Sequence, residues 1–388
     1  MEDLIYLDHA ATTPIDRRVI EAMWPYLSGD FGNPSSRHPR GESAARALDW
    51  AREAVAAALG GNAGEIVFTS GGTESDNLAI VGAALARRDR GDHVITTAIE
   101  HSAVLEPCRY LARHHGFRLT VLPVDRFGVV DLDALDRALD GATVLVSVMA
   151  ANNEVGTLEP IRQIAALTRS RGVLLHTDAV QAAGALPLDV DTLGVDLLSL
   201  SAHKIYGPKG VGALYVRRGT PIQPLLHGGG QERGLRSGTE NVPGIVGLAT
   251  ALQIADAERP ELVARSLPLR DRLIEGVLAA LPDALLTGHP TGRLPGHASF
   301  CFPGVHGEAV LVELGARGIC CSSGSACHAG STEPSHVLTA LGISPAVAHT
   351  AVRLSLGRET TEEEIDAVLS ALPEVVSGLL AAPTPTRL

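Results

Sequence analysis

The sequence predicts an α/β protein with a mainly parallel central sheet covered by helices on both faces, together with a smaller α+β domain. Short and nearly continuous apolar runs alternate with segments of helical periodicity as far as residue 216. Strands that are buried on both faces lack the polar alternation of a half-exposed sheet, so this pattern favours parallel strands between layers of helices. The chain has 388 residues, which is long enough for two domains.

The expected strands are apolar runs that turn residues separate from their neighbours. They span residues 66–69, 93–97, 144–149, 173–176, 197–200 and 213–216. Helical spacing of apolar side chains predicts helices over residues 44–59, 76–88 and 161–171, and these helices fill several of the gaps. In sheets of this kind, ligands bind beyond the carboxyl ends of the strands.

A long helical stretch at about residues 246–280 follows the last of these strands, and prolines then mark turns. The remaining residues have the mixed pattern of a small α+β domain. We therefore assign residues 15–260 to a large domain, and residues 1–14 and 261–388 to a small domain.

Charge and composition exclude several classes of protein. The formal net charge of −12 argues against a nucleic-acid or anionic-membrane surface. The longest apolar runs are too short to span a bilayer, and the first residues lack the pattern of a secretory signal. Five cysteines, an odd number, argue against a disulfide framework and favour a reducing cytoplasm. Zinc bound by the cluster at residues 320–327 is a weak alternative, because no paired C-x-x-C spacing occurs there.

The two lysines of the chain, Lys204 and Lys209, lie in one short run at residues 201–210, whereas the other 30 basic residues are arginine. Arginine does not lose its proton in a protein, so it cannot replace lysine as an amine nucleophile. Schiff-base formation, with a carbonyl substrate or with pyridoxal phosphate (PLP), requires such an amine. Clustering favours this interpretation over chance survival on a solvated loop, but it does not say which lysine is used.

Three further segments fall where a predicted strand ends. Residues 70–75 (SGGTES) join a strand to a helix, and glycines with free helix amides suit a phosphate, although an ordinary capped turn has the same pattern. Asp178 closes another strand, where a buried carboxylate needs a cation such as a protonated pyridine nitrogen; considered alone, a helix N-cap is the better interpretation. His101 follows a third strand. With the lysine run, these segments predict a PLP pocket at one edge of the sheet.

The runs at residues 6–14, 68–77, 152–156, 202–210 and 227–233 resemble those of cysteine desulfurases. That family belongs to the class V aminotransferase group of fold-type I PLP-dependent enzymes. The resemblance extends from about residue 5 to residue 370.

The resemblance implies a role for each matching residue. Lys204 forms the Schiff base with PLP, His101 stacks on the ring and relays protons, and Asp178 pairs with the ring nitrogen. Gln181 and Asn153 lie near the ring or its 3-hydroxyl group. The residues that surround the phosphate are Gly72, Thr73, Ser201 and His203.

Two more residues matter for partners and substrate. Thr239 is expected to reach the phosphate of a neighbouring subunit, which implies a homodimer. Arg353 is expected to clamp the carboxylate of the substrate, with Asn153 nearby, because a guanidinium group can hold a carboxylate bidentately.

Cys327 decides between the reactions that PLP supports. It lies among Gly, Ser and Ala in residues 321–327 (CSSGSAC), beside His328, whereas a structural cysteine such as Cys301 lies between apolar residues. We expect the Cys327 thiolate to attack the sulfur of L-cysteine, which gives alanine and a Cys327 persulfide. Sulfur then passes to an acceptor or scaffold protein for iron–sulfur cluster assembly, or for thiolation of tRNA or cofactors.

This cysteine run resembles the iron–sulfur-assembly type of the family. We expect no resident metal, although Cys327 could contact a cluster during transfer. Cys320 and Cys321 are expected to end a buried strand, with a second relay thiol as the minority interpretation. The alternatives are an aminotransferase, a selenocysteine lyase and, in another class, a metal-binding assembly protein.

Overall fold

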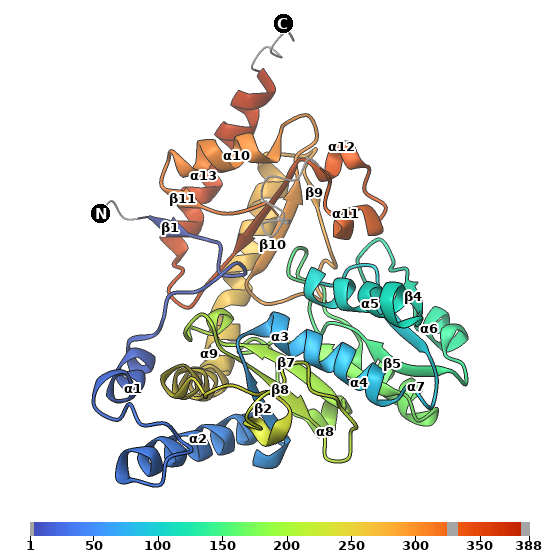
Figure 1. Ribbon diagram of the computed structural model, residues 1–388. Coiled ribbons are helices and arrows are strands. Elements are labelled where there is room, and N and C mark those ends of the chain that lie inside the picture. Colours follow the sequence, from blue (N-terminus) through green and yellow to red (C-terminus); the bar gives the residue numbers. More distant parts are fainter. Residues whose placement is uncertain (1–3, 324–332, 382–388) are drawn as a thin grey trace, which may run out of the picture.

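The computed structural model describes residues 4–323 and 333–381, and its largest feature is a seven-stranded sheet (Figure 1). The strands follow the order β2-β8-β7-β6-β5-β3-β4, and β8 is antiparallel to both of its neighbours while the other pairs are parallel. This mainly parallel sheet confirms the predicted fold class. The strands are β2 (Ile66–Thr69), β3 (His93–Thr97), β4 (Arg118–Leu122), β5 (Thr143–Ser147), β6 (Leu174–Asp178), β7 (Leu197–Ser201) and β8 (Gly212–Val216).

Helices cover both faces of this sheet because neighbouring residues of each strand point to opposite sides. In β3, Val94 packs into the core beneath α5 and the helix that begins at α3, whereas Ile95 packs into the core beneath α2, α7 and α9. The helices of this region are α1 (Arg17–Ser28), α2 (Pro39–Ala58), α3 (Gly72–Asn77), α4 (Ala83–Ala86), α5 (Ser102–His115), α6 (Leu132–Ala138), α7 (Ile161–Ser170) and α8 (Val190–Leu193). A π-helical segment, η2 (Leu78–Gly82), joins α3 to α4.

A smaller α+β region has its own sheets and its own core. β12 (Ala351–Ser355), β10 (His297–Cys301) and β9 (Leu285–Leu286) form an antiparallel sheet, and β1 (Ile5–Tyr6) pairs in parallel with β11 (Ile319–Cys320). The core between them contains apolar residues from the N-terminal segment, such as Leu7, and from the last strands and helices. The helices are α10 (Gly307–Gly315), α11 (His336–Ala340), α12 (Pro345–Ala348) and α13 (Glu362–Ala381).

Helix α9 (Val242–Ala280), 39 residues long, joins the two regions (Figure 1). Its first half, with Val242 and Ala255, packs into the core of the large sheet, and its second half, with Leu269 and Val277, packs into the smaller core. The domain division that we predict at residue 260 falls inside this continuous helix, and it stays a prediction. No helix in the described part of the chain has the length and apolar character needed to cross a membrane.

Candidate functional site

A cavity of about 350 Å³ lies where β2, β3, β6 and β7 end at their carboxyl edge. Two predicted site residues are not among its lining: Thr239 is exposed on the protein surface, and Cys327 lies outside the described residues. The lining also includes residues to which the sequence analysis gave no role, such as Asp76 and Ala10. The predicted residues that the structure brings together here are Gly72, Thr73, His101, Asn153, Asp178, Gln181, Ser201, His203, Lys204 and Arg353.

The two lysines differ in their surroundings. Lys204 ends the short 3₁₀ helix η3 (Ala202–Lys204) directly after β7, is partly buried and lines the cavity. Its Nζ donates to the carbonyl oxygens of Ala10 and Ala11, at 2.5 and 2.7 Å. Lys209 is exposed in the following turn. Position and contacts therefore favour Lys204 as the amine of the site.

Buried acidic groups lie at the base of the cavity. Asp178 is the last residue of β6, and its Oδ1 accepts a hydrogen bond from the Val180 amide at 2.9 Å. Asp76 also lines the cavity and is 1% exposed; among the described residues, its Oδ1 has no hydrogen-bond partner. Burial, followed by the Asp178 carboxylate, raises the pKa of Asp76 well above its usual value. Burial also raises the pKa of Asp178, and the hydrogen bond from the Val180 amide and the positive charge of Lys204 act against that rise.

His176 adds no charge beside the acidic groups of the cavity. It is fully buried, 3.6 Å from Asp76 Oδ1 through its Nε2, and its ring nitrogens contact the hydroxyl groups of Ser147 and Ser199. Burial lowers the pKa of His176 to about 3, so the imidazole is neutral at physiological pH. The acidic groups of the cavity therefore gain no cation from His176, and they suit a cationic ring nitrogen on a ligand.

The start of α3 suits a phosphate. Gly71, with φ of +152°, precedes α3, a backbone conformation that favours glycine. A Cβ atom on Gly72 would lie 2.9 Å from a methyl carbon of Val180, so only glycine fits against the cavity wall. The free amides at the start of this helix attract anions. His203 contributes no charge, because burial, Lys204 and Lys209 lower its pKa to about 4.

His101 is held by the loop that follows β3. It caps α5, and its Nδ1 accepts a hydrogen bond from the Ala103 amide at 3.1 Å, so in the neutral ring the proton lies on Nε2. The preceding Glu100 fixes this loop, because its carboxyl group accepts from the Met149 amide and from the Thr97 hydroxyl.

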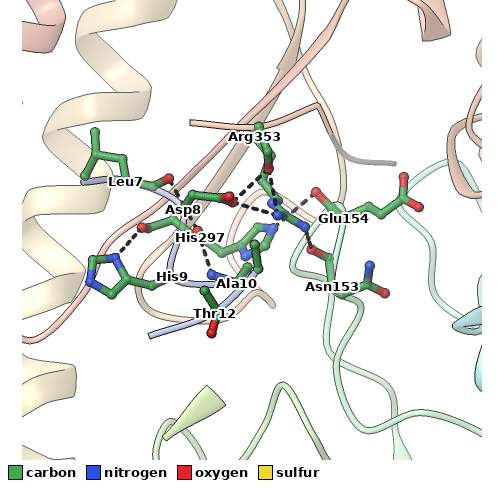
Figure 2. Close-up of polar contacts among 12 residues, drawn as sticks. Leu7, Asp8, His9, Ala10, Thr12, Asn153, Glu154, His297 and Arg353 are labelled. Atoms are coloured by element: carbon green, nitrogen blue, oxygen red, sulfur yellow. Dashed lines mark hydrogen bonds and ion pairs between the residues drawn. The ribbon is translucent and has the colours of Figure 1, made fainter. Parts of the chain in front are cut away.

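Arg353, on β12 of the smaller region, lines the cavity and is 2% exposed. Figure 2 shows its guanidinium group in contact with Asp8 and Asn153. Nη1 donates to the Asn153 carbonyl at 2.8 Å, and Nη2 donates to Asp8 Oδ1 at 2.8 Å and to Ser322 Oγ at 2.7 Å. Asp8 and Ser322 are not predicted as site residues from the sequence. The sequence feature that could have pointed to Asp8 is its place in the run at residues 6–14, which resembles the cysteine desulfurases.

The cysteines in the described part of the chain are buried or partly buried. Cys301 is fully buried in β10, as predicted. Cys320 and Cys321 are only partly buried, which corrects the expectation of a buried strand end, because β11 pairs with β1 at the edge of the smaller region. Burial nevertheless raises the pKa of Cys321 to about 12, which disfavours its thiolate. Among the described residues, no group of His, Cys, Asp and Glu side chains is arranged to hold a metal ion.

Comparison with known proteins identifies the family. The family model described as aminotransferase class-V matches residues 5–368. The chain belongs to the class-V aminotransferase family. Its similar relatives in this family include "Cysteine desulfurase IscS" of Methanosarcina thermophila, 52% identical over 97% of this chain and 92% of the relative, and "Cysteine desulfurase IscS" of Dictyoglomus turgidum, 49% identical over 98% and 96%.

Solved structures of class-V relatives agree with this assignment. A "NifS-like protein" superposes with a TM-score of 0.91 at 42% identity, covering 97% of this chain and 100% of the other. The structure titled "SspA in complex with cysteine" has a TM-score of 0.80 at 39% identity, covering 91% and 98%. The chain is thus a PLP-dependent enzyme of the cysteine desulfurase type. The glycine cradle, the buried acidic groups and the partly buried lysine of the cavity fit that cofactor.

Proposed function

We propose that this protein removes sulfur from L-cysteine, releasing L-alanine and leaving a persulfide on Cys327. The observation that carries the proposal is the convergence of Lys204, Asp178 and Arg353 on one cavity. This cavity occurs in a chain that is about half identical to proteins named cysteine desulfurase.

When bound, PLP supplies an electron sink that weakens the bonds at Cα and Cβ of an attached amino acid. Lys204 would hold the cofactor, Asp178 would hold the ring nitrogen, and the phosphate would lie at Gly72, Thr73, Ser201 and His203. The Lys204 amine lines the cavity and would accept the proton from substrate Cα. His101, with its proton on Nε2, would relay a second proton.

Sulfur transfer requires a nucleophile, and we assign this role to Cys327. Its thiolate attacks the substrate sulfur, an S–S bond forms, and the C–S bond breaks. The bonding pair stays with the carbon skeleton, which takes a proton and leaves as alanine. This assignment comes from the sequence and the family, since residue 327 lies outside the described residues.

The persulfide would pass its sulfur to an acceptor or scaffold protein in the cytoplasm. The run at residues 322–327 and the IscS name of the relatives favour iron–sulfur cluster assembly over thiolation of tRNA or cofactors. Cys327 could then contact the cluster as it receives sulfur.

A homodimer would complete the cavity, with Thr239 of one subunit reaching the phosphate site of the other. Two features support this arrangement. The segment that leads to Thr239 is held against α2 by the ion pair between Glu232 and Arg52, at 2.6 Å. Helices α1 and α2 also expose large apolar side chains, such as Trp24 and Trp50, which a second copy would cover.

The experiment that tests the function is a product assay with L-cysteine, a reductant and the purified protein. We expect equal amounts of alanine and sulfide from the wild type. Cys327→Ser should form neither product while keeping the visible absorbance of bound PLP. If the variant turned over cysteine as the wild type does, the proposed mechanism would be wrong, and an aminotransferase or another lyase would replace it.

A further inference from the structure

The guanidinium group of Arg353 has few donors left for a substrate. A guanidinium group carries five N–H groups. It can hold a carboxylate through Nε and Nη2 or through Nη1 and Nη2, so each of these two edges uses one hydrogen of Nη2. In this structure Nη2 already donates to both Asp8 and Ser322, and Nη1 donates to the Asn153 carbonyl. Nε is buried and has no hydrogen-bond partner among the described residues. A bidentate grip on a substrate carboxylate therefore requires one of the Nη2 contacts to be released.

Asp8 is the group that can leave at low cost. Its side chain is 19% exposed, whereas that of Arg353 is 3% exposed, so water can reach the released Asp8 carboxylate. Asp8 Oδ1 also accepts a hydrogen bond from Ser322 Oγ at 2.8 Å. Ser322, by contrast, is tied to Arg353 through two backbone hydrogen bonds and stays beside it.

We propose that Asp8 occupies the position on Arg353 that the substrate carboxylate takes, so that substrate binds by exchanging one carboxylate for another. The buried guanidinium group is then paired before and after binding, which avoids the cost of an isolated buried charge. Asp8 thereby lowers the affinity for substrate, because a ligand must carry a carboxylate that competes with Asp8 for Arg353. This inference depends on the proposed function of Arg353 as the substrate clamp.

The position of Asp8 in the chain gives the exchange a further consequence. Two and three residues later, the carbonyl oxygens of Ala10 and Ala11 accept the hydrogen bonds of Lys204 Nζ. Arg353 and Lys204 are therefore both held by the same short segment. Release of Asp8 from Arg353 acts on the segment that holds the amine.

The test uses the PLP-loaded protein and 3-mercaptopropionate, which has the carboxylate and thiol of cysteine but no amine to react with PLP. Its dissociation constant is measured by calorimetry for wild type, Asp8→Asn and Ser322→Ala, with the neutral amide of the same compound as a control ligand. Asp8→Asn removes the competing charge and keeps the side-chain shape. We expect it to bind the carboxylate roughly fivefold more tightly, the value of a partly exposed ion pair, and to leave binding of the amide unchanged.

The alternative to exchange is that Asp8 only orients Arg353. In that case Asp8→Asn would bind 3-mercaptopropionate more weakly than the wild type or equally well, and either result would overturn the exchange. Ser322→Ala frees one Nη2 hydrogen without removing a charge, so a small gain in affinity is expected there too; a loss would count against the proposal.

Failure of the proposed function has a different pattern. If Arg353→Lys bound the carboxylate as tightly as the wild type, Arg353 would not be the clamp, and the exchange would fall with it. If cysteine turnover by the wild type were absent while Asp8→Asn still gained affinity, the desulfurase proposal alone would fail.

Discussion

The two walls of the cavity differ in how they are fixed. The residues contributed by the large sheet lie at strand ends, with Asp178 on β6 and Lys204 just after β7, and the groups behind them are buried. Arg353 comes from the smaller region and is held by two side chains, Asp8 and Ser322, and by the backbone carbonyl of Asn153. On the proposed function, the large sheet holds the cofactor through residues at its strand ends, and the smaller region contributes Arg353 as the contact for the substrate.

The largest effect is expected on the large-sheet side, at Lys204. Lys204→Arg keeps a positive charge but removes the amine, so the visible absorbance of bound PLP should disappear and cysteine turnover should fall by roughly 10³-fold or more. Lys209→Arg is the matched control, since Lys209 is exposed outside the cavity. It should keep both the absorbance and the turnover. Spectra of the two purified variants check this directly.

An intermediate effect is expected on the Arg353 side. Arg353→Lys keeps the charge but loses the planar fork of donors, so the KM for L-cysteine should rise by roughly 10- to 100-fold. The absorbance of bound PLP should stay, because the cofactor contacts belong to the large sheet. Loss of PLP from this variant would show that the two walls are not independent.

The smallest effect concerns Asp76 and the stability of the protein without its cofactor. The pKa of Asp76 is raised in the folded state, so the unfolded chain loses this proton above about pH 4 while the folded protein keeps it. Stability from this group is therefore fully present at low pH and is lost as the pH rises toward the folded-state pKa.

Asp76→Asn mimics the protonated carboxyl group, so the variant does not lose this part of its folding stability as the pH rises. We expect its Tm at pH 7–8 to exceed that of the wild type by roughly 2–4 °C, with the difference vanishing near pH 4. Thermal unfolding of both cofactor-free proteins across this range is the measurement. A lower Tm for the variant at pH 7–8 would mean that Asp76 works as a charged group.

Much of the cofactor wall could be predicted from the sequence because each residue follows a local pattern. β2 and β3 begin and end where the apolar runs predict, and Asp178 and Lys204 fall at the ends of β6 and β7 as expected. The edge strand β4 was missed. It places Arg118 in solvent, and its residues show no continuous apolar run.

The contacts of Arg353 could not be predicted in the same way. Asp8 and Arg353 are 345 positions apart in the sequence, and their meeting depends on the pairing of β1 with β11 and on the position of β12. The role of Asp76 could not be predicted either. Its local sequence is that of an ordinary helix residue, and only the fold brings it into the cavity near Asp178. Tertiary packing, rather than local pattern, decides both.

The two lysines allow the central claim to be tested by one chemical measurement. Borohydride reduction of the purified protein fixes PLP on the lysine that holds it, and mass spectrometry of the peptides identifies that residue. We predict that the label lies wholly on Lys204. A label on Lys209, or a protein that takes up no label and has no visible absorbance, would contradict the assignment of this cavity as the cofactor site.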